Sequence, residues 1–297
     1  MTALESVFDW NIPAYFGGPG LVLGLAVFGL IVGTLTGLFG VGGGFLITPL
    51  LSVAFGIPYG LVIGSSLSFT IGTASSGMSR HVRLGNFEPR CTVILAGASM
   101  VAAILGGMLN RFLSDTLGAI QYRNTLDGLF VVVLAMAAWL VGRNKAPHHS
   151  GKSLLQRLRL PPHIDLPAAG LRHVSLPGIC LVGLAIGLMT GMMGIGGGVL
   201  FMPLLVLAVG LTPHQAVGTS LGVVVFGSMA GTIKYGLDGN VNLWIVMALL
   251  VSSVFGVQVG AWICHRLRAR HLRRYFAILV ALTAVTVAAR MGLSLLR

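Results

Sequence analysis

The chain has 297 residues, of which 55% are hydrophobic and only 9% are charged, whereas about 25% of the residues in a soluble globular domain are charged. A chain with so few charges cannot cover its apolar residues with a polar surface, so a soluble fold is excluded. The 19 Lys and Arg against 7 Asp and Glu give a net charge of +12. In a membrane protein this excess gathers in cytoplasmic loops, so we expect no nucleic-acid partner.

Apolar segments follow one another along the whole chain, and a bilayer core of about 30 Å needs about 20 apolar residues to span it. Two of the segments, Phe45–Phe55 and Val199–Val209, are too short for an ordinary span and are expected to be half-helices or re-entrant segments. The sequence therefore predicts an all-α polytopic membrane protein. The segments of spanning length are Leu21–Phe39, Gly60–Ser79, Thr92–Phe112, Asp127–Gly142, Val174–Met193, Pro213–Lys234, Val241–Cys264 and Tyr275–Leu293.

The chain contains an internal repeat. A shift of 154 residues aligns residues 29–86 with residues 183–240 without a gap, and 21 of the 58 aligned positions are identical. Gly, Pro and Thr stay in step, which chance matching of two apolar stretches would not produce. We therefore predict an N-terminal membrane repeat over residues 1–142, a basic cytoplasmic linker over residues 143–173 and a C-terminal membrane repeat over residues 174–297.

Two topologies fit this duplication: parallel repeats of four crossings each, or inverted repeats of five crossings each that include the short segments. Loop charge favours the inverted arrangement. The net charge is +2 for Arg80–Arg90, +5 for the linker and +5 for Arg266–Arg274, whereas the equivalent loops of the other repeat are not basic. Inverted repeats of five crossings place these three segments together in the cytoplasm and both termini outside.

Each repeat carries one GxGGG motif between a long and a short apolar segment, with a proline five residues further on. Because each glycine costs a helix about 1 kcal/mol relative to alanine, the motif predicts a helix break that frees backbone N–H groups. In lipid such groups need a partner, and the N-terminus of the next helix attracts an oxyanion. The alternative is that the glycines only allow close helix packing. The motif residues are Gly40, Gly42, Gly43, Gly44 and Pro49 in the first repeat, and Gly194, Gly196, Gly197, Gly198 and Pro203 in the second.

Hydroxyl side chains form a second paired feature. As hydrogen-bond donors near the break they suit the oxygens of sulfite or a sulfonate. The alternative, a hydrogen bond to the carbonyl of residue i−4 in the same helix, is common in membrane helices and stays open. The hydroxyl residues are Ser65 and Ser66 with their equivalents Thr219 and Ser220, and the weaker pair Thr36 and Thr190.

Charged residues are few near the predicted spans. Arg80 and Lys234 are repeat equivalents at helix ends, where each could attract an anion into a vestibule or serve as a snorkelling anchor. His81 and Asp127 are the candidates for ion coupling, since no Asp or Glu lies at the centre of an apolar segment. The His148–His149 pair has no further ligands around it, and no cysteine motif exists, so we expect neither a metal nor a cofactor.

The two GxGGG-xxxx-PLL segments, followed by GSSL and GTSL, resemble the TauE/SafE family of sulfite exporters, also called the TSUP family. The resemblance implies a multi-pass permease of the bacterial inner membrane for sulfur-containing anions: sulfite, thiosulfate, sulfoacetate or another organosulfonate. It maps the family motif onto the ten glycine and proline positions given above. The expected partners are a small anion and the lipid bilayer, and a homodimer is left open.

The direction of transport follows from electrostatics. An inside-negative potential of 100 mV is worth about 2.3 kcal/mol per charge, so an anion leaves the cell without coupling, and export by alternating access is favoured. Another small anion, a carboxylate or an inorganic ion taken up with protons, stays open as the alternative. An enzyme is disfavoured because the sequence brings together no nucleophile, acid–base pair or metal cluster. A scaffold is disfavoured because it would not need a duplicated break.

Overall fold

The computed structural model describes residues 19–55, 57–142, 154–157 and 160–295. Nearly all of the described chain is helical, and five of its helices are long and apolar enough to cross a bilayer. The predicted all-α polytopic membrane fold is therefore confirmed. The helices are α3 (Pro19–Phe39), α4 (Gly44–Phe55), α5 (Tyr59–Arg83), α6 (Pro89–Thr116), α7 (Ala119–Gly142), α9 (Leu176–Met193), α10 (Gly198–Leu204), α11 (Pro213–Leu237), α12 (Leu243–Arg266) and α13 (Ala269–Leu295).

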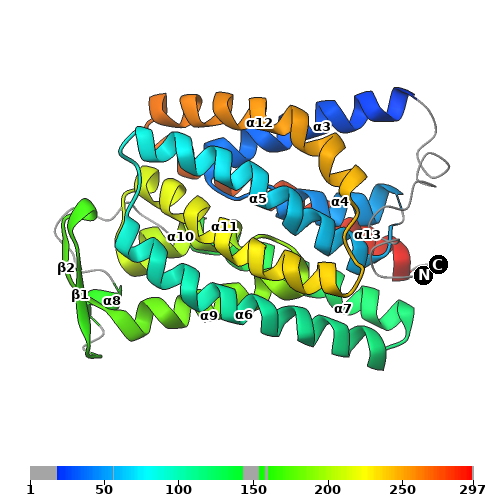
Figure 1. Ribbon diagram of the computed structural model, residues 1–297, viewed down its shortest axis with the longest axis horizontal. Helices are drawn as coiled ribbons and strands as arrows, with labels where there is room; N and C mark the ends of the chain where they lie inside the picture. The colour runs from blue at the N-terminus through cyan, green and yellow to red at the C-terminus, as the bar shows by residue number, and fades with distance from the viewer. Residues whose placement is uncertain (1–18, 56, 143–153, 158–159, 296–297) are drawn as a thin grey trace.

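The predicted linker holds structure that the sequence analysis did not anticipate. A short helix α8 (Leu154–Arg157) precedes an antiparallel hairpin of β1 (His163–Leu166) and β2 (Leu171–Ser175), joined by the 3₁₀ turn η1 (Pro167–Ala169). The hairpin caps one end of the helical bundle (Figure 1). His148 and His149 lie outside the described residues.

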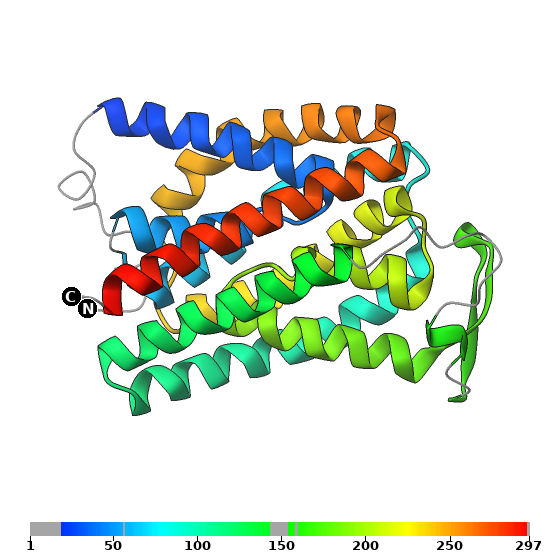
Figure 2. The ribbon, with the colours of Figure 1, turned by 180° about the vertical axis from the view of Figure 1, so that it is seen from behind.

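Both GxGGG motifs interrupt the helices where predicted. The first separates α3 from α4, and the second separates α9 from α10 and the π-helix η2 (Leu205–Val209) that follows it. Both half-helices turn back, so that α4 returns toward the end where α3 begins, and α10 with η2 returns toward the start of α9 (Figures 1 and 2). The two short apolar segments are thus the second arms of two helical hairpins.

The two repeats are interleaved. Helix α3 of the first repeat packs along α12 of the second, α9 of the second packs along α6 of the first, and α5 packs against α11 in the centre. Glycines allow the close approach: a Cβ added at Gly33 would lie 2.1 Å from the Ser253 carbonyl oxygen, and one at Gly191 would lie 1.9 Å from that of Ala103. At these positions close packing of small residues explains the glycines.

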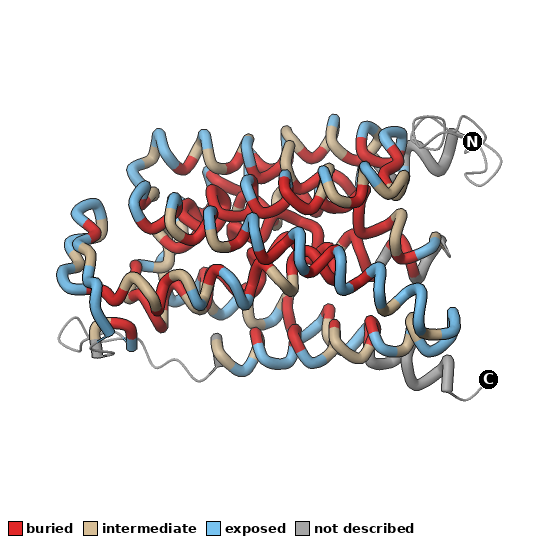
Figure 3. The backbone as a smooth tube through the Cα atoms, turned by 60° about the horizontal axis from the view of Figure 1, so that its bottom comes forward, coloured by how far each residue is buried: buried red, intermediate tan, exposed pale blue. Residues whose placement is uncertain are grey.

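The bundle has two ends. The linker end carries the β-hairpin and the turns α5–α6 and α12–α13, and the termini end carries the start of α3, the turns α6–α7 and α11–α12, and the last described turn of α13 (Figure 1). All three basic segments, as far as they are described, lie at the linker end. Helix α5 runs from the termini end to the linker end, and its repeat equivalent α11 runs the other way. The buried residues concentrate in the middle of the bundle (Figure 3).

Candidate functional site

The breaks have a backbone conformation that favours glycine. A positive φ places a residue in the left-handed region, where a Cβ is strained. The first helix of each pair closes with a hydrogen bond, from Gly40 N–H to the Thr36 carbonyl at 2.8 Å and from Gly194 N–H to that of Thr190 at 2.9 Å. The glycines with positive φ are Gly40 (73°), Gly42 (76°) and Gly43 (87°), and Gly194 (68°), Gly196 (71°) and Gly197 (73°).

The two breaks touch each other in the middle of the molecule. A Cβ added at Gly44 would lie 2.5 Å from the Gly194 carbonyl oxygen, and one added at Gly198 would lie 2.4 Å from the Cα of Val41. The two backbones therefore meet with no side chain between them. The helix hairpins of the two repeats form one central site.

Backbone donors at the breaks are left without partners. The next helices begin with hydrogen bonds to the carbonyls of Gly43 and Gly197. Between the end of one helix and the start of the next, the N–H groups donate no hydrogen bond to any described residue, although all are buried. Buried N–H groups rarely stay unpaired, and successive amides in such turns form a concave anion-binding nest. The residues with these N–H groups are Val41, Gly42, Gly43, Ile195, Gly196 and Gly197.

Two of the predicted hydroxyls connect each repeat to the break of the other. The Ser66 Oγ lies 3.1 Å from the Gly194 carbonyl oxygen, and the Ser220 Oγ lies 2.9 Å from that of Gly40. Each hydroxyl also lies 2.9 Å from a carbonyl of its own helix, three residues earlier. The two hydroxyls therefore face the breaks and also bond back to their own helices, at residue i−3 and not at the expected i−4. A contact between them and substrate stays a prediction.

The neighbouring hydroxyls have a different use. The Ser65 Oγ accepts a hydrogen bond from the Asn242 N–H at 2.9 Å, and the Thr219 Oγ1 accepts one from the Glu88 N–H at 3.1 Å. Asn242 and Glu88 are the N-caps of α12 and α6. Ser65 and Thr219 therefore anchor the start of a helix in the opposite repeat, and a contact between them and substrate stays a prediction.

Threonines close to the breaks complete the polar lining. The hydroxyls of Thr36 and Thr70 are buried and have no partner among the described residues, whereas Thr190 bonds to the Ile186 carbonyl at 2.9 Å. A Cβ at Gly42 or at Gly196 would lie within 3.0 Å of the Thr70 methyl group, so Thr70 touches both breaks. Sequence reasoning missed Thr70 because its repeat equivalent is a valine. A search for lone hydroxyls in the central helices would have found it.

The Ser220 contact makes a first prediction. Ser220→Ala leaves the Gly40 carbonyl without its cross-repeat partner, and we expect a loss of about 1 kcal/mol of stability, measured as a lower unfolding temperature of the purified protein. The control is Ser252→Ala, since the Ser252 hydroxyl bonds only to the Leu249 carbonyl of its own helix. Equal unfolding temperatures for the two variants would contradict a specific role of the cross-repeat bond.

The two coupling candidates lie in different places. The His81 ring bonds through Nε2 to the Gly37 carbonyl at 3.0 Å, just before the first break. Asp127 is buried at the side of the bundle and accepts a hydrogen bond from the Tyr59 hydroxyl. The structure thus brings together the glycines, Ser66, Ser220 and Thr36 with Thr190, and leaves Asp127 outside that group.

Pro49 and Pro203 lie inside α4 and α10. Each stands five residues after the last glycine of its motif, in the short arm that turns back from the break. A proline removes one backbone hydrogen bond from a helix and bends it. A gating role for these prolines stays a prediction.

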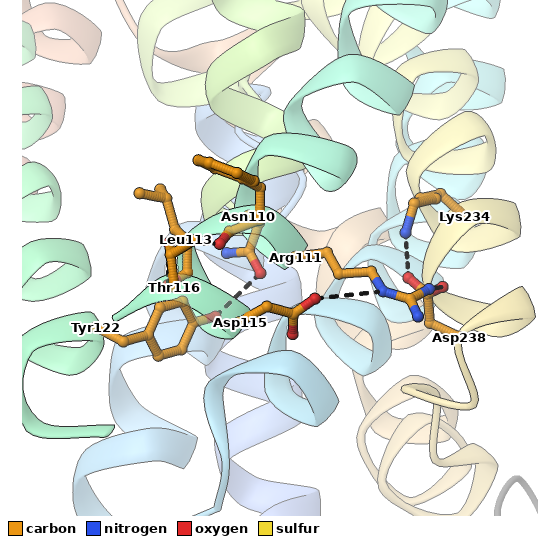
Figure 4. A network of polar contacts seen from close by, with 9 residues as sticks. Asn110, Arg111, Leu113, Asp115, Thr116, Tyr122, Lys234 and Asp238 are labelled. Atoms are coloured by element: carbon orange, nitrogen blue, oxygen red, sulfur yellow. Dashed lines mark hydrogen bonds and ion pairs between the residues drawn. The ribbon is translucent and has the colours of Figure 1, made fainter. Parts of the chain in front are cut away.

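A cavity of about 360 Å³ opens at the termini end. Its floor connects to the second break, because the Tyr235 hydroxyl donates to the Gly191 carbonyl at 2.9 Å and the Asn110 amide donates to that of Met192 at 2.7 Å. The Tyr122 hydroxyl in turn donates to Asn110 at 3.0 Å (Figure 4). Two hydrogen bonds therefore join the last turn of α9, just before the second break, to residues that line the cavity. The residues lining it are Pro58, Tyr59, Gly60, Leu61, Asn110, Arg111, Ser114, Asp115, Tyr122, Tyr235, Asp238 and Asn240.

Interleaved repeats, two broken helices meeting at the centre and a polar cavity at one end are features of secondary transporters. The chain belongs to the sulfite exporter TauE/SafE family, whose model matches residues 25–287. It is similar to a probable membrane transporter protein of Methanocaldococcus jannaschii, with 28% identity over 84% of this chain and 88% of the relative. Another of that name, from Xylella fastidiosa strain Temecula1, is 30% identical over 90% of this chain and 95% of its own length. Bacillus subtilis YunE, also named a probable membrane transporter protein, is 24% identical over 87% of this chain and 94% of the relative. No solved structure matches significantly.

Proposed function

We propose that this membrane transporter is a permease for small sulfur-containing oxyanions, namely sulfite, thiosulfate, sulfoacetate or another organosulfonate. The observation that carries the proposal is the set of buried backbone N–H groups without partners where the two breaks meet. The family description, which names a sulfite exporter, supports the choice of substrate class. The anion is carried out of the cell by alternating access around the paired breaks.

The chemistry of the central site suits an oxyanion. Backbone N–H groups at the start of α4 and α10 point the positive ends of two helix dipoles at the same place. No Lys or Arg is among the buried residues around the breaks, so the anion is held by amides and hydroxyls. Such binding is moderate in strength, because no full charge opposes release. Moderate binding suits a carrier, because a carrier has to release its substrate on the far side of the membrane.

We propose further that the two repeats have inverted topology, with the linker end in the cytoplasm of a prokaryotic cell. What supports this is the opposite direction of α5 and α11 and the position of the three basic segments at one end, as expected for cytoplasmic loops. At the termini end the described helices and turns carry Arg111, Arg123, Lys234 and Arg290 against three carboxylates, so this end has almost no net charge.

The topology makes a second prediction. Gly118 and Gly239 lie in the turns α6–α7 and α11–α12 at the termini end. Reporter fusions that are active only outside the cytoplasm should give a signal at both positions, although the positions lie in different repeats. A fusion at Gly85, in the turn α5–α6, is the control and should give none. Cytoplasmic signals at both Gly118 and Gly239 would rule out this orientation.

A second function has one observation in its favour. Asp127 is a carboxylate buried in a membrane-spanning helix and bonded to Tyr59, which lines the termini-end cavity. Buried carboxylates in membrane helices often carry protons. Proton-coupled uptake of a small carboxylate or inorganic anion is therefore the alternative. Asp127→Asn should leave sulfite flux unchanged under the first proposal and abolish coupled uptake under the second.

The proposal is tested with purified protein in proteoliposomes. The flux of sulfite, thiosulfate and sulfoacetate is compared with that of acetate and chloride at equal concentration. We expect flux of at least one sulfur oxyanion that is well above that of acetate and is absent from protein-free liposomes. Flux of acetate or chloride alone would overturn the substrate class.

A further inference from the structure

The ion pairs of the described chain are unevenly distributed. All three lie at the termini end, around the cavity: Arg111 with Asp238 at 2.6 Å, Lys234 with the other oxygen of Asp238, and Arg111 with Asp115 at 4.0 Å (Figure 4). Asp238 and Lys234 are largely buried, with side chains only 12% and 13% exposed. The largely buried carboxylate of Asp238 thus pairs with both Arg111 and Lys234.

The repeat places related residues at the linker end. Lys234 and Arg111 correspond to Arg80 and His265, so both positions keep a basic side chain. Asp238 corresponds to Leu84. The two residues have the same backbone conformation as helix C-caps, with φ −83° and ψ 0° for Asp238 and φ −86° and ψ 0° for Leu84. The linker end therefore keeps the cation at Arg80 and has a histidine at the position of Arg111, but it has the uncharged Leu84 where the termini end has Asp238.

Buried nitrogen atoms at the linker end have no partner. Three of them are the Nε of Arg80, the Nδ1 of His81 and the Nδ2 of Asn86, and the Nη1 of Arg273 at the start of α13 is a fourth; all are buried and without a hydrogen bond to a described residue. The first three side chains come from the last turn of α5 and the turn that follows it. The repeat equivalents of His81 and Asn86 are Tyr235 and Asn240, which both line the termini-end cavity. The same positions at the linker end therefore present unpaired polar groups.

The three groups suit a small oxyanion. The guanidinium of Arg80 and the amide of Asn86 are donors. The His81 ring donates from Nε2 to the Gly37 carbonyl, so its neutral form offers Nδ1 as an acceptor for the O–H of a hydrogen oxyanion such as hydrogensulfite. Glu88, whose Oε2 is also buried without a partner, is the only carboxylate of this turn, against Arg80, Arg83 and Arg90.

We infer that the linker end holds a second oxyanion site, built on Arg80, His81 and Asn86, and that Asp238 weakens the equivalent site at the termini end. The inference rests on the proposed function. An anion arriving at the linker end finds unpaired donors, whereas at the termini end it competes with Asp238 for Arg111 and Lys234. The asymmetry leaves the equilibrium distribution across the membrane unchanged, since that depends only on the gradients. It sets a lower half-saturation constant at the linker end.

The repeat supplies the variants that test this. Leu84→Asp places a carboxylate four residues after Arg80, in the geometry of Lys234 and Asp238, and should raise the half-saturation constant for sulfite at the linker end about 3- to 10-fold. Asp238→Leu should lower the constant at the termini end by a similar factor. Leu84→Asn, with a polar but uncharged side chain, is the matched control and should stay within about 2-fold of the unmodified protein.

The measurement is sulfite influx and efflux in proteoliposomes of one known orientation, with folding checked by size-exclusion chromatography. The second site is supported if the half-saturation constants at the two ends differ in the unmodified protein and become more similar in Leu84→Asp and in Asp238→Leu. Sulfite transport with equal constants at both ends, or Leu84→Asp behaving like Leu84→Asn, overturns it and leaves the proposed function intact. Absence of transport of sulfite, thiosulfate and sulfoacetate alike from the unmodified protein overturns the proposed function itself.

Discussion

Gly44→Ala and Gly198→Ala are each expected to reduce sulfite flux in proteoliposomes about 5- to 150-fold while the protein still inserts and purifies. The added methyl group would lie 2.5 Å from the Gly194 carbonyl oxygen in the first variant and 2.4 Å from the Val41 Cα in the second. Overpacking of this kind costs about 1–3 kcal/mol. If this cost raises the free energy of the conformations in which the breaks meet, and so the barrier to transport, it corresponds to the stated loss of rate.

These two glycines are informative because they lack positive φ. Alanine can therefore adopt the backbone conformation at both positions, and the reduction in sulfite flux measures the contact between the breaks. Gly97→Ala is the matched control, since Gly97 lies inside α6 with nothing within 4 Å of an added Cβ. It should leave flux unchanged and stabilise the helix by up to about 1 kcal/mol. Flux at the level of Gly97→Ala in both break variants would rule out a site where the breaks meet.

Transport of a monovalent oxyanion is expected to be electrogenic. The buried polar side chains that contact the breaks or the last turns before them are hydroxyls, the His81 ring and the Asn110 amide, and the buried carboxylates Glu88 and Asp127 lie elsewhere. Without a carboxylate at the centre to carry a proton, each anion moves its full charge across the bilayer. A potential of 100 mV is worth about 2.3 kcal/mol per charge, which corresponds to about a 50-fold difference in concentration at equilibrium.

This result is measured with a potassium gradient and valinomycin, by following the distribution of a labelled monovalent sulfonate between the lumen and the medium. Gly198→Ala, with its slowed flux, serves as the control for leak. A distribution that ignores the potential and follows an imposed pH gradient would contradict uniport and favour the proton-coupled alternative with Asp127.

The fold could be predicted to the extent that local composition determines it. The apolar segments gave the number and order of the long helices, and the glycine runs gave the positions of both breaks. The start of α7 was wrong: the helix begins at Ala119, before the predicted Asp127, because the polar residues Gln121, Arg123 and Asn124 interrupt the apolar pattern without ending the helix. The β-hairpin escaped prediction because its strands have only four and five residues.

Less of the candidate site than of the fold could be predicted from the sequence, because the contacts of the site join residues of different repeats. The pairs Ser66–Gly194 and Ser220–Gly40 join residues 128 and 180 positions apart, and no local pattern encodes which repeat a hydroxyl faces. Thr70 was missed because a search for paired features discards a position whose equivalent is Val224. The cluster of Arg111 and Asp238 was missed for the same reason, since Leu84 breaks the pairing.

The amide nitrogen chemical shifts of Val41 and Ile195 test the central claim most directly. Both N–H groups lie between the arms of the broken helices and lack partners among the described residues. In protein labelled at these residue types and titrated with sulfite, we predict that both resonances move and saturate with one dissociation constant. Sulfite transport by the same protein, with both resonances unmoved at saturating sulfite, would contradict binding of the anion at the paired breaks.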